Sequence, residues 1–106
     1  MPSEITPREL KQRLDRGDRV IVLDVREAEE LALARVHGAV HIPMGEIAGR
    51  LHELDPDREI VVMCHHGVRS ARVTSFLAQR DFTCVVNLAG GIDLWSLTVD
   101  ASVPRY

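Results

Sequence analysis

The chain has 106 residues, of which 45% are hydrophobic and 27% charged, and its formal net charge at pH 7 is −3. This length and composition are typical of one globular domain over residues 1–106. The negative charge, without a basic run or an aromatic platform, argues against nucleic acid as a partner. No apolar run approaches the roughly 18 residues that cross a membrane, and residues 1–4 do not resemble a signal peptide. We therefore expect a cytoplasmic protein with no membrane partner.

A first helix is predicted from Pro7 to about Arg16. Thr6 is a good N-cap, Pro7 suits the first helical position, and Glu9 completes a capping box. Gly17 is expected to end the helix. Its role should be structural.

The apolar run over residues 20–25 predicts a central strand that is buried on both faces. Asp24 is the exception in this run, because a buried carboxylate must be paired or hydrogen-bonded. Arg26 follows almost at once. We expect Asp24 to tie neighbouring loops together, which is compatible with a supporting role for Asp24 and Arg26 beside the loop that begins at Cys64.

The rest of the chain continues to alternate between helices and strands. A turn at Gly38 and a short strand that ends before Pro43 are expected in the middle of the chain. Helices are predicted over 27–35, 44–54, 68–80 and 92–97, and further strands over 60–63 and 84–88. The helix over 68–80 should be well buried, since its apolar residues surround much of it. This alternation predicts an α/β fold, with a parallel sheet and helices on both faces.

Two histidines and the second cysteine are assigned structural roles. His37 and His41 lie four residues apart, but Gly38 and Pro43 argue against a helix that would align them, and no third ligand has a spacing typical of zinc. Cys84 lies in an apolar run without a cationic neighbour and should be a core thiol. A disulfide with Cys64 is unlikely from these contexts, which favours a reducing compartment.

Cys64 is the strongest candidate for chemistry. It follows a buried strand and precedes a helix, and backbone N–H groups at a helix N-terminus attract anions. A cysteine held there should have a lowered pKa, although an inert buried thiol is the alternative. Ligands bind at the carboxyl ends of strands in such sheets, where Asp24 also falls. The candidate site consists of the nucleophile Cys64 and the binding loop His65, His66, Gly67, Val68, Arg69 and Ser70.

Each type of residue in this loop suits an anion. Gly67 permits a positive φ, Arg69 supplies a positive charge, and Ser70 can donate its hydroxyl to a thiolate. His65 and His66 could donate hydrogen bonds at the rim. Such a loop would stabilise a thiolate or the charge of a persulfide.

With these residues the sequence resembles the rhodanese-like family of sulfurtransferases, over roughly Ile5 to Trp95. The resemblance rests on residues 22–27, 37–43, 64–70 and 88–92, the last together with Trp95. It implies a three-layer α/β/α fold around a five-stranded, mostly parallel sheet. It also implies that Cys64 takes a sulfane sulfur from a small anionic donor such as thiosulfate and passes it to cyanide or a thiol acceptor, with no cofactor. Many members carry arginine directly after the cysteine, where this chain has His65.

Other interpretations remain open. A cysteine-dependent phosphatase or arsenate reductase would carry arginine at the position of Ser70, whereas Arg69 comes one residue early. A regulatory binding module would have lost the cysteine, but a persulfide carrier served by a sulfur-relay protein fits these residues equally well. A metal or dithiol site is disfavoured, because Cys64, His65 and His66 are contiguous and no Cys-x-x-Cys occurs.

Overall fold

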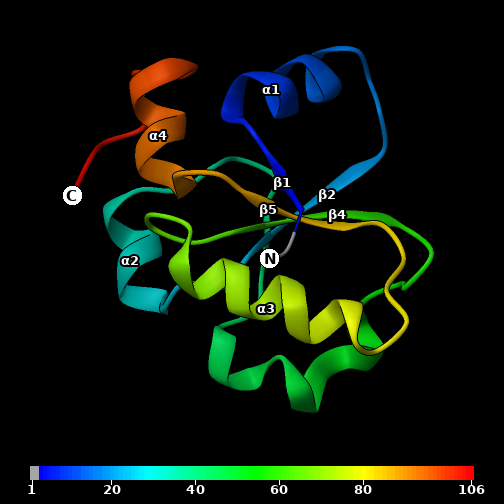
Figure 1. Ribbon diagram of the computed structural model, residues 1–106. Helices are drawn as coiled ribbons and strands as arrows, with labels where there is room; N and C mark the ends of the chain where they lie inside the picture. The colour runs from blue at the N-terminus through cyan, green and yellow to red at the C-terminus, as the bar shows by residue number, and fades with distance from the viewer. Residues whose placement is uncertain (1–2) are drawn as a thin grey trace.

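The computed structural model describes residues 3–106, in which a five-stranded sheet separates two layers of helices (Figure 1). All neighbouring strands are parallel. Across the sheet the order is β1 (Glu4–Ile5), β5 (Val85–Leu88), β4 (Glu59–Met63), β2 (Val20–Asp24) and β3 (Val40–His41). The predicted α/β fold is confirmed. The middle strand is β4, and β2 is an interior strand beside it.

Helix α1 (Pro7–Asp15) begins as its sequence predicts. The Thr6 hydroxyl accepts the N–H of Glu9 at 3.1 Å, and the Glu9 carboxylate accepts the N–H of Thr6 at 3.0 Å. These reciprocal bonds satisfy two backbone donors that a helix otherwise leaves free. Leu10 then packs into the core.

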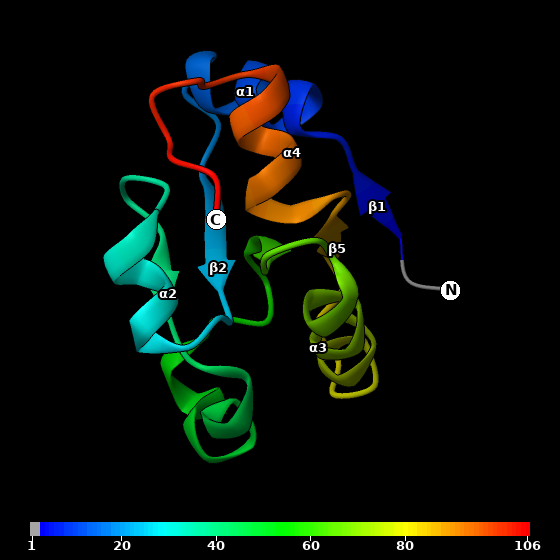
Figure 2. The same ribbon diagram turned by 90° about the vertical axis from the view of Figure 1, so that its left-hand side faces the viewer.

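Two hydrophobic clusters fill the two faces of the sheet. Residues of β4 alternate between them, because successive side chains of a strand point to opposite faces. Val61 and Met63 pack with α1 and α4 (Gly91–Thr98). Ile60 and Val62 pack on the other face with α3 (Val68–Ala78). Figure 2 shows α1 and α4 on one side and α3 on the other, with α2 (Ala28–Leu33) beside the end of β2.

The prediction of one regular helix over 44–54 is wrong. The segment forms two 3₁₀ helices, η1 (Met44–Glu46) and η2 (Ala48–Glu53), and Arg50 has non-helical dihedral angles. Ile47 and Leu54 are nevertheless buried. The apolar pattern thus predicted which side faces the core, but tight 3₁₀ turns satisfy it as well as a regular α-helix does.

Helix α3 is less buried than its sequence suggests. Val73 and Leu77 are buried, but Val68 is 66% exposed and Ala78 is also at the surface. Only one side of a helix can face the sheet. The small apolar residues on its other side are therefore exposed.

The prediction of a core thiol at Cys84 is also wrong, because Cys84 is exposed. Strand β5 begins one residue later, at Val85, so Cys84 belongs to the turn that precedes the sheet. Both cysteines are free. His41 makes a structural contact as expected, with Nε2 2.7 Å from the carbonyl oxygen of Arg26. Among residues 3–106, no helix has the length and apolar character that a membrane span requires.

Candidate functional site

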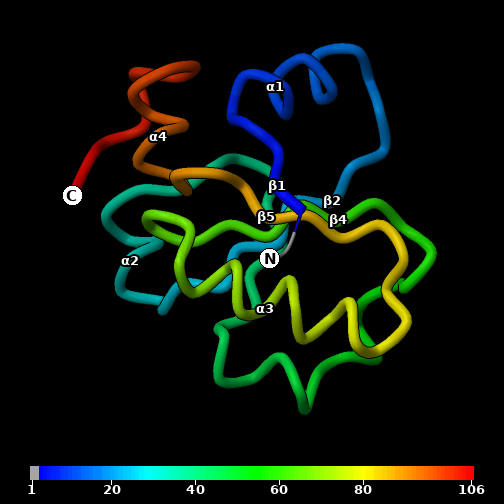
Figure 3. Tube along the Cα trace, viewed as in Figure 1, coloured from blue at the N-terminus to red at the C-terminus, as the bar shows by residue number. Residues whose placement is uncertain are grey.

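Cys64 lies at the carboxyl end of β4, in the middle of the sheet edge where such folds bind ligands. The chain turns through residues 64–67 and enters α3 at Val68, and this loop lies against the start of α4 (Figure 3). The carbonyl oxygens of Cys64 and His65 accept the N–H groups of Ile92 and Asp93, at 2.9 and 3.1 Å. The loop is therefore fixed to the first turn of α4.

Gly91 makes this close approach possible. Its φ is +62°, and a Cβ atom at this position would clash with the carbonyl oxygens of Cys64 and His65. Any larger residue would push α4 away from the loop. The sequence analysis did not identify the contact of Gly91 with the candidate site.

The loop points hydrogen-bond donors at the sulfur. The N–H of Gly67 lies 3.1 Å from Cys64 Sγ, and the Ser70 hydroxyl lies 3.2 Å from it. Gly67 has a φ of +103°, which favours glycine and turns its N–H inward. The backbone N–H groups of His66 and Ser70 also act on the thiol.

These donors outweigh the effect of burial on Cys64, whose side chain belongs to the core and is 1% exposed. Burial raises the pKa of the thiol, since it disfavours the charged form. Hydrogen bonds from the Ser70 hydroxyl and from the N–H groups of Ser70, Gly67 and His66 lower it, and the net pKa is below the ordinary value. The arrangement is suited to a thiolate nucleophile or to the charge of a persulfide.

Asn87 supports the loop from below and was not predicted. It is buried on β5, and its Nδ2 donates to the carbonyl oxygen of Gly67 at 3.1 Å. This bond anchors the Gly67–Val68 peptide, which adjoins the residue whose N–H points at the sulfur. A polar residue inside the apolar run of β5 was the only signal for it in the sequence.

Asp24 and Arg26 form a buried ion pair. This agrees with the prediction that a buried Asp24 must be paired and ties neighbouring loops together. Arg26 Nη2 lies 2.7 Å from Asp24 Oδ2, and Arg26 Nε lies 3.0 Å from Asp24 Oδ1. Arg26 also donates to the carbonyl oxygen of Ala34 at 2.8 Å. The pair thus joins the end of β2 to the end of α2, beside the strand that leads to Cys64.

Arg69 is not a free charge in the loop. Its Nη1 and Nη2 each lie 2.8 Å from a carboxylate oxygen of Glu30, on α2. Hydrogen bonds from Arg69 are the main reason that the pKa of Glu30 falls to about 2. Hydrogen bonding to Glu30 raises the pKa of Arg69, and the charge of Cys64 adds to the rise, so Arg69 lies within electrostatic reach of the sulfur.

Tyr106 closes the rim of the site, although no sequence pattern marked it. The C-terminal segment passes between α4 and α2 (Figure 2), and the Tyr106 ring stacks on His65 with centroids 3.9 Å apart. Its hydroxyl lies 2.8 Å from Arg26 Nη1 and donates to Glu30 Oε1 at 3.3 Å. One side chain therefore links the buried Asp24–Arg26 pair to the Glu30–Arg69 pair.

A rhodanese-like domain family model matches residues 6–98 of this chain. The chain belongs to the rhodanese-like family. The match covers most of the chain and includes the four segments on which the resemblance rests. The α/β fold agrees with it.

Two curated proteins and one solved structure are similar to this rhodanese-like chain over most of its length. The putative sulfur carrier protein YrkF of Bacillus subtilis is 38% identical over 93 residues, which are 88% of this chain but only 50% of YrkF. The putative sulfurtransferase YtwF of the same organism is 38% identical over 87% of this chain and 88% of its own length. The crystal structure of a rhodanese-like domain protein from Staphylococcus aureus has a TM-score of 0.85 and 32% identity, and the match covers 98% of each chain.

The rim of this rhodanese-like site contains possible metal ligands, His65, His66 and Asp93, whose ligand atoms lie within 4.8 Å of one another. Two features oppose a cation there. The two imidazole rings are stacked on each other, with centroids 3.8 Å apart. Asp93 is paired with Arg105 at 2.8 Å. The absence of a metal from the site remains a prediction.

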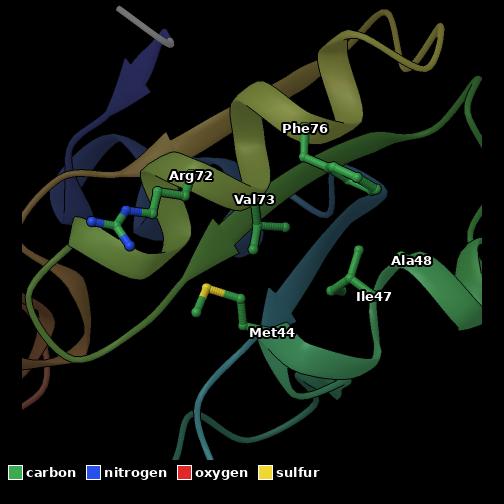
Figure 4. A pocket seen from close by; sticks show the side chains of 6 residues that line it. All are labelled: Met44, Ile47, Ala48, Arg72, Val73 and Phe76. Atoms are coloured by element: carbon green, nitrogen blue, oxygen red, sulfur yellow. The ribbon is translucent and has the colours of Figure 1, made fainter.

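An apolar groove lies to one side of the Cys64 loop, between α3 and the 3₁₀ helices (Figure 4). It is lined by Met44, Ile47, Ala48, Arg72, Val73 and Phe76. Residues 64–70 are not among its lining. The groove is therefore distinct from the donors that surround the sulfur.

Proposed function

We propose that this protein is a sulfurtransferase that moves a sulfane sulfur from a donor such as thiosulfate to cyanide or a thiol, through a persulfide on Cys64. Membership of the rhodanese-like family and the names of its relatives, a sulfurtransferase and a sulfur carrier, support a sulfur-transfer role. The observation that carries the proposal is the Cys64 sulfur, which lies 3.1 Å from the Gly67 N–H and 3.2 Å from the Ser70 hydroxyl.

In the first half-reaction the Cys64 thiolate attacks the outer sulfur of thiosulfate. A bond forms between the two sulfur atoms, the S–S bond of thiosulfate breaks, and sulfite leaves with the electron pair. In the second half-reaction cyanide attacks the terminal sulfur of the Cys64 persulfide, and thiocyanate leaves as the thiolate is restored. No external oxidant or reductant is needed, because sulfane sulfur is passed on unchanged.

The loop residues have one role in both half-reactions. The N–H groups of His66, Gly67 and Ser70 hold negative charge on the Cys64 sulfur before transfer and on the persulfide afterwards. His65 and Val68 form the rim. Asp24 and Arg26 support the loop from the end of β2, through Tyr106 and Glu30.

A second candidate is a persulfide carrier that receives sulfur from a partner protein. The relative named as a sulfur carrier favours it. So does the exposed apolar side chain of Val68, which lies four residues after Cys64 and offers a contact for a protein partner. A cysteine-dependent phosphatase is less well supported, because Ser70 occupies the place of the required arginine and Arg69 is engaged by Glu30.

The domain and its location follow as further proposals. We propose that residues 1–106 form a single rhodanese-like domain, which the sharing of one sheet by all five strands supports. We also propose a cytoplasmic location, since the two free cysteines fit a reducing compartment.

Intact-mass measurement before and after treatment with thiosulfate tests the proposed function. We expect a gain of one sulfur atom on Cys64 that cyanide removes. Cys84 is exposed and could react on its own, so Cys64→Ser and Cys84→Ser are both needed: the gain should vanish in the first and persist in the second. Sulfur that depends only on Cys84 would refute the proposal, as would a Cys64 that takes no sulfur from thiosulfate, inorganic polysulfide or a thiol persulfide. Sulfur from the last two donors but not from thiosulfate would favour the carrier.

A further inference from the structure

Three arginines around the Cys64 loop are paired with carboxylates of the same chain. Each of these guanidinium groups lies within 2.8 Å of a carboxylate oxygen, and the pairs are Arg69–Glu30, Arg26–Asp24 and Arg105–Asp93. Their charges cancel in pairs. These three arginines therefore add little net positive charge beside the hydrogen-bond donors of the loop.

Glu30 is held firmly on Arg69. Its carboxylate accepts both Arg69 nitrogens, and it also accepts the backbone N–H of Glu27 at 2.9 Å and the hydroxyl of Tyr106 at 3.3 Å. The side chain of Glu30 is 20% exposed. With four donors on it, this carboxylate remains ionised and in place near neutral pH.

We propose that Glu30 is a specificity-determining residue that, by neutralising Arg69, makes the site favour thiol persulfides over dianionic donors such as thiosulfate. This inference rests on the proposed sulfur-transfer function. Arg69 is the loop's own cation and immediately precedes Ser70, whose hydroxyl lies 3.2 Å from the Cys64 sulfur. With its charge cancelled, Arg69 does not offset the charge of a dianion.

The two donor classes place different charges beside the thiolate. Thiosulfate brings two negative charges to the Cys64 thiolate, and sulfite carries both away. A neutral thiol persulfide, R–S–SH, brings none: the thiolate attacks the outer sulfur, the S–S bond breaks, and R–S⁻ leaves while Cys64–S–SH forms. Like charges repel most strongly where solvent is scarce, and Cys64 is 1% exposed. Cancelling the charge of Arg69 thus penalises thiosulfate much more than it penalises a persulfide.

One nearby cation remains outside these pairs. Arg72 lies on α3, one turn after Val68, and makes no ion pair within residues 3–106. Figure 4 shows its guanidinium at the edge of the apolar groove, directed away from Met44 and Ile47. Arg72 is the alternative source of positive charge for an anionic donor, and the experiment must separate it from Arg69.

The test compares donor preference in the wild type and in Glu30→Gln. We would measure kcat/KM for transfer to cyanide from thiosulfate and from the persulfide of 2-mercaptoethanol, whose R group is uncharged. Glu30→Gln should raise the ratio of thiosulfate to persulfide activity about tenfold, the scale of one unit charge screened near a protein surface. Glu53→Gln is the matched control, because Glu53 pairs with Arg50 on η2 and takes no part in the site. It should leave the ratio unchanged.

Two further variants keep the outcome decisive. The double variant Glu30→Gln/Arg69→Gln removes both charges and should restore the wild-type ratio. Arg72→Gln in the Glu30→Gln background should retain the gain, and a gain that disappears there would assign the charge effect to Arg72 and overturn the inference. Unchanged ratios with both activities intact would also overturn it and leave the proposed function standing. A wild-type Cys64 that accepts sulfur from neither donor would instead refute the proposed function, and the inference with it.

Discussion

Ser70→Ala should raise the pKa of the Cys64 thiol and slow its reactions near neutral pH. Ser70 is buried, and its hydroxyl lies 3.2 Å from the sulfur. Among the hydrogen bonds that lower the pKa of the thiol, this one has the largest effect. A hydrogen bond to a charged group stabilises by about 1.5–3 kcal/mol, and a bond between neutral groups by about 0.5–1.5 kcal/mol. The thiolate therefore gains about 1 kcal/mol more from Ser70 than the thiol does, so losing the hydroxyl should lower the thiolate fraction about fivefold at a pH below the thiol pKa.

The rate of alkylation of Cys64 by iodoacetamide, measured against pH, gives this pKa directly. The measurement needs a Cys84→Ser background, because Cys84 is exposed and would also react. Thr74→Val is a suitable control, since Thr74 is a buried hydroxyl in the same helix that donates to the Ser70 carbonyl and not to the sulfur. A pKa that is the same in Ser70→Ala and in the control, with the fold intact, would refute the role assigned to Ser70.

Three other perturbations test the surroundings of the loop. Gly91→Ala should destabilise the protein by about 1–3 kcal/mol, because φ is +62° and the new Cβ would clash with backbone carbonyl oxygens. Urea unfolding measures this change in stability. In the control Gly45→Ala the added Cβ meets no atom within 4 Å, so the loss of stability should be much smaller. The pKa of Glu30 falls from its ordinary 4.5 to about 2 in the folded protein, so its contribution is complete above pH 4.5 and is lost as the pH falls through about 2. Glu30→Gln should therefore be less stable than the wild type near neutral pH, by no more than about 1 kcal/mol for a partly exposed pair, and a deficit that persisted in urea unfolding at acid pH would contradict this. Burial is the main reason that the pKa of His65 is lowered, and the Tyr106 ring covers the His65 ring. Tyr106→Ala should raise that pKa in an NMR titration, whereas Tyr106→Phe keeps the stacked ring and should leave the pKa lowered. Equal pKa changes in both variants would disprove the effect of stacking.

Tertiary context explains where the sequence misled. Cys84 follows the pattern of a buried strand, but β5 begins one residue later and leaves the thiol in a turn. The apolar residues at 47 and 54 are buried as expected, although the backbone between them forms 3₁₀ turns. Local periodicity reports which residues avoid water and not which hydrogen-bond pattern the backbone adopts.

By itself the sequence determined the features that short-range chemistry controls. The cap at Thr6, the buried strand before Cys64 and the positive φ of Gly67 each depend on a few neighbouring residues. The loop at Cys64 was therefore predictable together with its family. Its donors reach the sulfur because the seven residues from Cys64 to Ser70 close on themselves.

Only the tertiary structure decided what surrounds the loop. Glu30 meets Arg69 across 39 residues of sequence, and Tyr106 reaches Arg26 across 80. These contacts exist because the strand order places β2 beside β4, so that α2 and the C-terminal segment lie beside the Cys64 loop. No local pattern marks Tyr106 or assigns a partner to Arg69. The charge of the site, unlike the position of its nucleophile, is a property of the assembled fold.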